Sequence, residues 1–250
     1  MKAIIVAAGI GSRLGELTKN MPKSLVDVNG KSILERQISV FRKLGITDIT
    51  VIIGPHSEKY KIKNISIIKD IEFMSHDILS SLMIAKPIMD DELIVCYGDI
   101  IFDEQILRPI IDFNQDIGLG IDFDWEKNYS ENDDQSKQHA STVEIKNGLI
   151  LKIKGNSISN EYKNKKLGEF TGIIKLSKIG SEILIKNYDE LLINHEGQFH
   201  ESPSFSQAYF TDMFQELIDS GVNIHPITVN GVWCEIDTEK DLNTAKKLFP

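Results

Sequence analysis

A glycine-rich connection near the start of the chain is the segment best suited to chemistry. The apolar run Ala3–Val6 leads into residues 7–25, which read AAGIGSRLGELTKNMPKSL. Gly9, Gly11 and Gly15 permit tight turns and a close approach of the main chain to a ligand. Successive backbone N–H groups in such a loop form a concave surface that attracts anions. The spacing therefore predicts a loop that wraps around phosphate groups.

Two basic side chains stand in the same connection. Arg13 offers a planar fork of donors that suits phosphate oxygens. Lys23 adds a flexible point charge, and Pro22 restricts the backbone before it. Leu14 stands where a dinucleotide-binding fingerprint needs its third glycine, and Lys23 lies too far from the glycines for a Walker A loop. A flexible turn with unrelated surface cations is the alternative, but the combination favours a site for a nucleoside triphosphate.

Carboxylates that hold a divalent cation are the second requirement. A reaction between two phosphates brings negative charges together, and Mg²⁺ held by one or two carboxylates screens them. Asp99 follows an expected strand and Gly98, which places it at the edge of the sheet. Glu235 and Asp237 alternate with Ile236 and so share one face of a short extended segment. Asp99 and Asp237 are the candidate ligands; the alternatives are a turn aspartate at 99 and a helix cap at 237.

Composition disfavours several classes of protein. The chain has 250 residues, of which 41% are hydrophobic, enough for one domain with a buried core. The net charge of −9 disfavours a bulk nucleic-acid binder. No run of about 18 apolar residues is present and no secretory signal follows Met1, so we expect a cytoplasmic protein. Cys96 and Cys234 form no Cys-x-x-Cys pattern and are interpreted as packing residues.

The first half of the chain alternates strands and helices. Strands are expected at Lys2–Ala7, Asp48–Ile53, Ile65–Lys69 and Glu92–Cys96, and helices at Ser32–Leu44 and Ile78–Lys86. Continuous Ile and Val in these strands suit a parallel sheet covered on both faces. The pattern predicts a doubly wound, mainly parallel α/β fold, in which ligands collect at the carboxyl ends of the strands. The glycine-rich connection and Asp99 both fall at that edge.

The second half has an α+β pattern. Asn147-Gly148 between two apolar runs predicts a hairpin. Strands are expected at Ser141–Lys146, Leu149–Ile153, Phe170–Leu176 and Val222–Val229, and helices at Ser181–Asn194, about Ser206–Ser220 and Thr238–Leu248. Residues 122–134 and 155–166 are expected to be loops. We expect one domain over 1–250, with a nucleotide-binding half at 1–115 and an acceptor-binding half at 116–250.

Residues 7–25 resemble the signature of the sugar-nucleotidyltransferase superfamily, whose enzymes join a nucleotide to a phosphorylated acceptor and release pyrophosphate. Tyr97–Asp99, Asp122–Trp125, Gly168–Gly172, Thr211–Glu216 and Trp233–Thr238 resemble its later motifs. The set is most similar to small bacterial cytidylyltransferases that act on phosphocholine, 2-aminoethylphosphonate and related phospho-compounds. The resemblance implies a GT-A-like variant of the Rossmann fold. It also implies CTP-dependent transfer of CMP to phosphocholine, an aminoalkylphosphonate or a phospho-amino acid such as phosphoglutamine, for modification of surface polysaccharide such as capsule.

The resemblance also implies roles for single residues. Lys23, Arg13, Asp99 and Asp237 form the expected catalytic set, with Asp99 and Asp237 as ligands of Mg²⁺ or Mn²⁺. The nucleotide is expected at Ala7, Ala8, Gly9, Gly11, Ser12, Arg13, Lys23, Asp77, Ser81 and Gly98. Related cytidylyltransferases place an asparagine where this chain has Asp77. This aspartate either accepts a hydrogen bond from the cytosine amino group or only caps the next helix.

The acceptor site is less defined. Asp122, Asp124 and Glu169 are candidates for pairing with an amino group, with Glu235 beside them. Trp125 and Trp233 are candidates for an aromatic face, although core packing is the favoured interpretation of both. Lys152 and Lys154 are available for a carboxylate, but nothing in the sequence singles them out. The expected partners are small molecules rather than nucleic acid or membrane, with a dimer as one option for assembly.

The sequence disfavours three other functions. A sugar-1-phosphate nucleotidyltransferase that uses UTP or dTTP is disfavoured by the segment 77–82 and by the short length without a C-terminal β-helix. A non-catalytic nucleotide-binding regulator is disfavoured because the four expected catalytic residues are all present. A glycosyltransferase is disfavoured because isoleucines, rather than an Asp-x-Asp pattern, follow Asp99.

Overall fold

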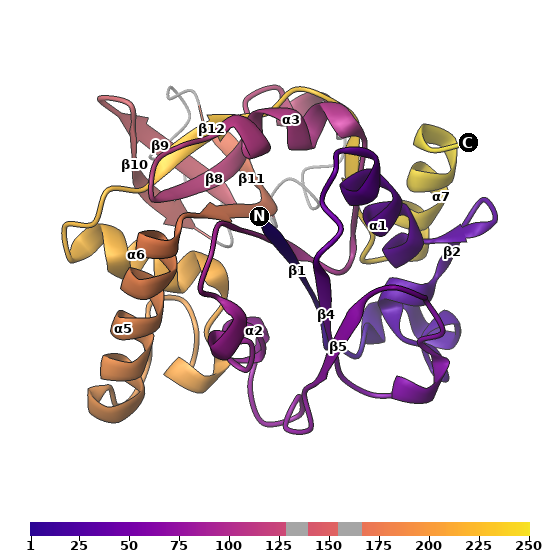
Figure 1. Cartoon of the computed structure of the whole chain (residues 1–250), viewed down its shortest axis with the longest axis horizontal. Coiled ribbons are helices and arrows are strands. Elements are labelled where there is room, and N and C mark those ends of the chain that lie inside the picture. Colours follow the sequence, from indigo (N-terminus) through magenta and orange to yellow (C-terminus); the bar gives the residue numbers. More distant parts are fainter. Residues whose placement is uncertain (129–139, 155–166) are drawn as a thin grey trace.

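The computed structural model describes residues 1–128, 140–154 and 167–250. These residues form a mixed α/β structure around a nine-stranded sheet that carries helices on both faces (Figure 1). The expected α/β class is confirmed. No helix in the described ranges is both long enough and apolar enough to cross a bilayer.

The first half contains the parallel strands that were expected. Its strands are β1 (Lys2–Ala7), β2 (Asp27–Val28), β3 (Lys31–Ser32), β4 (Ile49–Ile53), β5 (Ser66–Lys69), β6 (Leu93–Tyr97) and β7 (Ile100–Phe102). Its helices are α1 (Ile33–Lys43), α2 (Ile78–Met83) and α3 (Glu104–Asp112). β1 lies between β4 and β6 and is parallel to both, so the carboxyl ends of these strands meet at one edge. A capping box of Ser32 and Glu35 starts α1.

The second half extends the same sheet. Its strands are β8 (Ile117–Asp122), β9 (Thr142–Lys146), β10 (Leu149–Lys154), β11 (Gly168–Leu176), β12 (His225–Thr228) and β13 (Trp233–Glu235). Its helices are α5 (Lys178–Asn194), α6 (Phe210–Asp219) and α7 (Glu239–Leu248). The main path of the sheet is β10-β9-β11-β6-β1-β4-β5, with β8 and β12 paired beside β11. The predicted hairpin is confirmed, with left-handed backbone at Asn147 and Gly148.

Several elements differ from the sequence prediction. β7, α3, β8 and β13 were not predicted, and Asp122 ends β8 instead of beginning a loop. Residues 129–134 and 155–166 of the expected loops lie outside the described residues. Pro109 lies inside α3 and weakens its helical signal. α2 ends at Met83 rather than Lys86, and α6 begins at Phe210 rather than near Ser206.

Two apolar layers enclose the sheet. On one face, Leu79 of α2, Leu184 of α5 and Phe214 of α6 share a core with β1 and β6. On the other face, Leu34 of α1 and Ile106 of α3 pack on the same strands. Figure 1 shows these two sets of helices on opposite sides of the sheet.

A smaller apolar cluster supports the glycine-rich connection. Leu14 of this connection packs with Ile33 of α1 and with Leu242 and Ala245 of α7. Because α7 begins at Glu239, two residues after Asp237, this packing places that carboxylate beside the connection.

Candidate active site

The position of Lys23 requires a glycine at position 11 of the glycine-rich connection. The φ of Gly11, 69°, lies in the left-handed region, and a Cβ there would lie 2.7 Å from the Cβ of Lys23. Thr18 fixes this backbone, because its Oγ1 donates to the Gly11 carbonyl over 2.7 Å. The connection therefore packs directly on the lysine side chain.

Gly11→Ala is expected to lower kcat/KM for the nucleotide substrate by about tenfold to a hundredfold, because the added methyl group displaces Lys23. Gly30→Ala is the matched control: Gly30 also has a left-handed φ, 85°, but nothing lies within 4 Å of its added Cβ. The control carries only backbone strain of about 1–2 kcal/mol. Kinetics and thermal unfolding of both variants provide the measurement. Equal losses of activity would assign the effect to strain and not to Lys23.

Lys23 lies between two carboxylates. Its Nζ donates to Asp99 Oδ2 over 2.8 Å and also to Asp237, and the residue is 9% exposed. Arg13 joins from the solvent side, with its Nη1 2.9 Å from Asp237 Oδ2. Burial favours the neutral amine, but the charges of Asp99 and Asp237 outweigh it and raise the pKa of Lys23 above its usual value. Lys23 is therefore a buried cation.

Three carboxylates form an acid cluster, defined here as Asp99, Glu235 and Asp237. One oxygen from each lies within 4.8 Å of the others. The Oδ1 atom of Asp99 is buried and has no hydrogen-bond partner among the residues that the structure describes. Hard oxygen donors in this number suit Mg²⁺, which binds one or two carboxylates together with phosphate oxygens. The cluster therefore fits a divalent cation.

The pKa of Glu235 reflects this crowding. Loss of solvation, followed by the negative charges of Asp99 and Asp237, raises the pKa of Glu235 well above its ordinary value, although its side chain still reaches solvent. The positive charge of Lys23 opposes that shift.

Long-range strand pairing assembles the acid cluster. Asp99 follows β6 and Gly98, where a Cβ would lie 2.6 Å from the Cβ of Ala7. β13 pairs antiparallel with β7, and Ile236 N donates to the Asp99 carbonyl over 3.0 Å. Thr238, and not Asp237, is the N-cap of α7, in a capping box with Asp241. The helix-cap interpretation of Asp237 is therefore wrong, and its carboxylate faces Lys23 instead.

A cleft of about 460 Å³ adjoins the glycine-rich connection. Ser12 and Gly15 line one side, and Phe73 and Met74 line the other. Ala7 and Ala8 are buried at the end of β1, and Gly9 is exposed with no atom within 4 Å of an added Cβ. The expected nucleotide residues of this connection thus lie together at the carboxyl edge of the sheet.

Asp77 is both a helix cap and a half-buried acid. Its side chain accepts from Ile78 N over 3.1 Å as the N-cap of α2, and Tyr209 also bonds to it. Loss of solvation raises the pKa of Asp77, while those hydrogen bonds oppose the shift. The capping interpretation of Asp77 is confirmed.

Asp70 was missed by the sequence analysis. It is buried after the end of β5, where Ser81 Oγ donates to its Oδ2 over 2.7 Å and His76 Nε2 lies 3.2 Å from its Oδ1. Asp70 therefore anchors the segment that carries Asp77. The hydroxyl of Ser81 points to this buried carboxylate. The position directly after a strand was the only available signal.

Four of the expected acceptor residues lie on β8, β11 and β13, and the other two, Asp124 and Trp125, follow the end of β8. Trp125 is 2% exposed and its Nε1 donates to the Leu167 carbonyl over 3.1 Å. Trp233 is 7% exposed and its Nε1 donates to Asp122 Oδ2 over 2.9 Å. Glu169 is buried, and the backbone N–H of Asp124 donates to Asp122. Burial of both indoles favours the packing interpretation of the two tryptophans.

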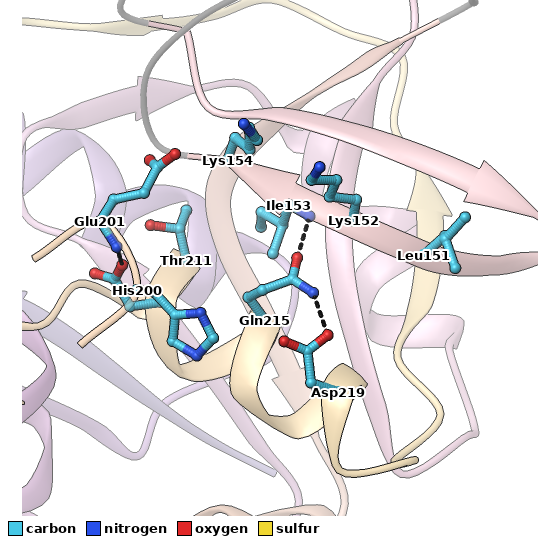
Figure 2. A pocket seen from close by; sticks show the side chains of 10 residues that line it. Leu151, Lys152, Ile153, Lys154, His200, Glu201, Thr211, Gln215 and Asp219 are labelled. Carbon is cyan, nitrogen blue, oxygen red and sulfur yellow. Dashed lines mark hydrogen bonds between the residues drawn. The ribbon is translucent and has the colours of Figure 1, made fainter. Parts of the chain in front are cut away.

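A second cleft of about 460 Å³ lies between β10 and α6 (Figure 2). Figure 2 shows Lys152 and Lys154 on β10, with Gln215 and Asp219 on α6. Gln215 accepts from Ile153 N over 2.9 Å and so ties the helix to the edge strand. The cleft marks β10 as an accessible edge of the sheet.

Fold and site together define a class of enzyme. A parallel sheet whose carboxyl edge carries a glycine-rich connection, a buried lysine and three carboxylates is the arrangement expected of a nucleotidyltransferase. Residues 3–117 match the family described as MobA-like NTP transferase domain. The chain is a nucleotidyltransferase.

Individual relatives narrow this class. CTP:phosphoglutamine cytidylyltransferase of Campylobacter jejuni subsp. jejuni serotype O:2 is 28% identical over 255 residues, which cover 97% of this chain and 98% of that protein. Choline-phosphate cytidylyltransferase of Streptococcus pneumoniae is 50% identical over 60 residues, 24% of this chain and 26% of that protein. The structure of CTP:phosphocholine cytidylyltransferase from Streptococcus pneumoniae has the same fold, with a TM-score of 0.76 and 21% identity over 100% of this chain and 99% of that one. The resemblance to cytidylyltransferases is confirmed.

Proposed function

We propose that the protein is a CTP-dependent cytidylyltransferase that joins CMP to a small phosphorylated acceptor and releases pyrophosphate. The observation that carries this proposal is Lys23, buried between Asp99 and Asp237 beside the glycine-rich connection. Similarity over nearly the whole chain to a CTP:phosphoglutamine cytidylyltransferase supports the choice of nucleotide. A sugar-1-phosphate nucleotidyltransferase is less supported.

The reaction requires no covalent intermediate. An oxygen of the acceptor's phosphate or phosphonate attacks the α-phosphorus of CTP, and the bond from that phosphorus to the bridging oxygen breaks as pyrophosphate leaves. Lys23 neutralises charge at the α-phosphate, and Arg13 does so at the leaving β- and γ-phosphates. The attacking oxygen is already ionised, so positioning and charge stabilisation account for catalysis. Mg²⁺ or Mn²⁺, held by Asp99 and Asp237 with Glu235 nearby, would screen the phosphate charges.

The function has a direct test. The protein is incubated with Mg²⁺ and each NTP in turn, together with phosphocholine, 2-aminoethylphosphonate, phosphoglutamine or glucose 1-phosphate. Pyrophosphate release is expected with CTP and at least one of the first three acceptors. Release only with UTP or dTTP and glucose 1-phosphate would overturn the proposal for both base and acceptor.

Asp77→Asn is expected to reduce the preference for CTP over UTP by about tenfold, which is ~1.4 kcal/mol. A carboxylate accepts from the cytosine amino group and repels uracil O4, whereas an amide can donate to that oxygen. Asparagine is an equally good N-cap, so α2 is retained. The ratio of kcat/KM values for the two nucleotides gives the measurement. An unchanged ratio would restrict Asp77 to capping.

Cellular context completes the proposal. We place the enzyme in the cytoplasm, where nucleoside triphosphates are available. Its CMP-linked product would then serve as the donor for modification of surface polysaccharide. One nucleotidyltransferase domain over 1–250 suits this function, because one sheet runs through the nucleotide-binding and acceptor-binding halves.

A further inference from the structure

Four side chains form a row across four adjacent strands of the second half. Lys154 of β10 is paired with Thr142 of β9, which is paired with Glu169 of β11. Glu169 is in turn paired with Asp122 of β8. Residues directly opposite one another on antiparallel strands project to the same face of a sheet. We call Lys154, Thr142, Glu169 and Asp122 the acceptor row.

The neighbouring residues confirm which face the row occupies. Ile153, Val143, Phe170 and Ile121 each lie one position from a member of the row, and all four belong to the core beneath α6. Alternation along the strands therefore directs the acceptor row to the opposite face.

The acidic end of the row adjoins the acid cluster. Asp122 accepts from Trp233 Nε1 over 2.9 Å, and Glu235 follows two residues later on the same face of β13. The row thus begins beside the expected metal ligands.

The basic end lies two strands away from Glu169, at a distance of about 10 Å between backbones. Register distinguishes the two lysines of β10. Lys152 stands opposite Glu144, a carboxylate, whereas Lys154 stands opposite Thr142. Within the described parts of the chain, Lys154 forms no ion pair and is half-buried at the open edge of the sheet, where Figure 2 shows its side chain. Lys154 is therefore the lysine placed to bind an anionic group.

We propose that the acceptor row selects a phosphorylated amino acid, with the ammonium group beside Glu169 and Asp122 and the carboxylate at Lys154. The proposal rests on the proposed function and specifies its acceptor. A row that is acidic near the metal ligands and basic at its far end matches a ligand with charges of both signs. Phosphocholine and aminoalkylphosphonates lack the carboxylate and would leave Lys154 without a counterion.

Two pairs of acceptors test this choice, each pair differing by one carboxylate. They are O-phosphoserine with O-phosphoethanolamine, and phosphoglutamine with N-phosphoryl-4-aminobutyramide. With CTP and Mg²⁺, kcat/KM is expected to be at least about tenfold higher for the carboxylate-bearing member, as one charge-assisted contact provides. Lys154→Met is expected to remove this preference through KM of the acceptor, leaving the carboxylate-free members and KM for CTP unchanged. Lys154→Arg should retain the preference.

Lys146→Met is the matched control, because Lys146 is exposed on the same hairpin and is paired with Leu149 beyond the row. An equal effect of Lys154→Met on both members of a pair, or no preference in the wild type, would overturn the proposal. Failure of the proposed function has a different signature: no member of either pair is turned over with CTP. In that case, calorimetry measures the affinity of each paired acceptor for the wild type and for Lys154→Met. Loss of the carboxylate-dependent affinity in the variant supports the proposed role of the acceptor row. Equal affinities refute it.

Discussion

Replacing Lys23 by methionine is expected to lower kcat by about 10²–10³-fold, the usual effect of removing one preorganised charge from a transition state. The dissociation constant of CTP is expected to change far less, because the amides of the glycine-rich connection and Arg13 still bind the phosphates. The geometry supports this separation: Lys23 is buried between Asp99 and Asp237, whereas Arg13 reaches in from solvent. Single-turnover rates and nucleotide binding measured on the same variant separate the two effects.

Folding must be checked in this experiment. Removing Lys23 leaves Asp99 and Asp237 close together without their buried cation, at a cost of about 3–5 kcal/mol. Lys23→Arg keeps the charge and is expected to retain stability while losing turnover, since the guanidinium cannot occupy the place of an ammonium. Lys31→Met, at an exposed lysine of β3, is the control for general loss of charge. Near-wild-type turnover in folded Lys23→Met would refute the assigned role.

Local patterns predicted the first half of the fold well. Continuous Ile and Val in β1 and β4 produce buried parallel strands, and the capping box at Ser32 marks the start of α1. Local sequence patterns did not predict β8, because Gly118 and Gly120 interrupt its strand signal. A Cβ at Gly118 would lie 2.6 Å from Ile227 Cδ1, so this glycine serves a contact with a distant part of the chain. No local pattern reveals such a requirement.

The residues of the candidate site also divide into those that local sequence predicts and those that depend on long-range strand pairing. Lys23 and Asp99 were predictable because each follows a strand or turn with its own signal. The approach of Asp237 to Asp99 depends on the pairing of β13 with β7, which the sequence does not display. The distinction between Lys152 and Lys154 depends on strand register, which shifts between Ile150 and Lys152. A slip of one residue would move Lys154 to the other face.

Asp237 has two roles in the candidate site, one toward basic side chains and one in the acid cluster, and the substitution Asp237→Asn distinguishes them. It accepts from Lys23 and pairs with Arg13, and it also belongs to the acid cluster. Asp237→Asn is expected to lower kcat/KM by about 10²-fold or more, because a metal ligand supplies several kcal/mol of charge stabilisation. If the carboxylate binds the metal, the concentration of Mg²⁺ that gives half-maximal activity also rises, and excess Mg²⁺ restores part of the rate.

The Mg²⁺ titration decides between these roles. Loss of activity with an unchanged half-saturating Mg²⁺ concentration would show that Asp237 acts only by holding Lys23 and Arg13. Asp99→Asn, tested in parallel, should raise the Mg²⁺ requirement as well, because the buried Oδ1 of Asp99 has no other partner within residues 1–128, 140–154 and 167–250. Glu239→Gln removes an exposed carboxylate in the first turn of α7 and is the matched control, with the Mg²⁺ dependence of the wild type expected. A carboxylate that accepts from Lys23 and also bound the metal would keep Lys23 charged and correctly placed, so we expect substitutions of Asp99 and Asp237 to cause large losses of activity.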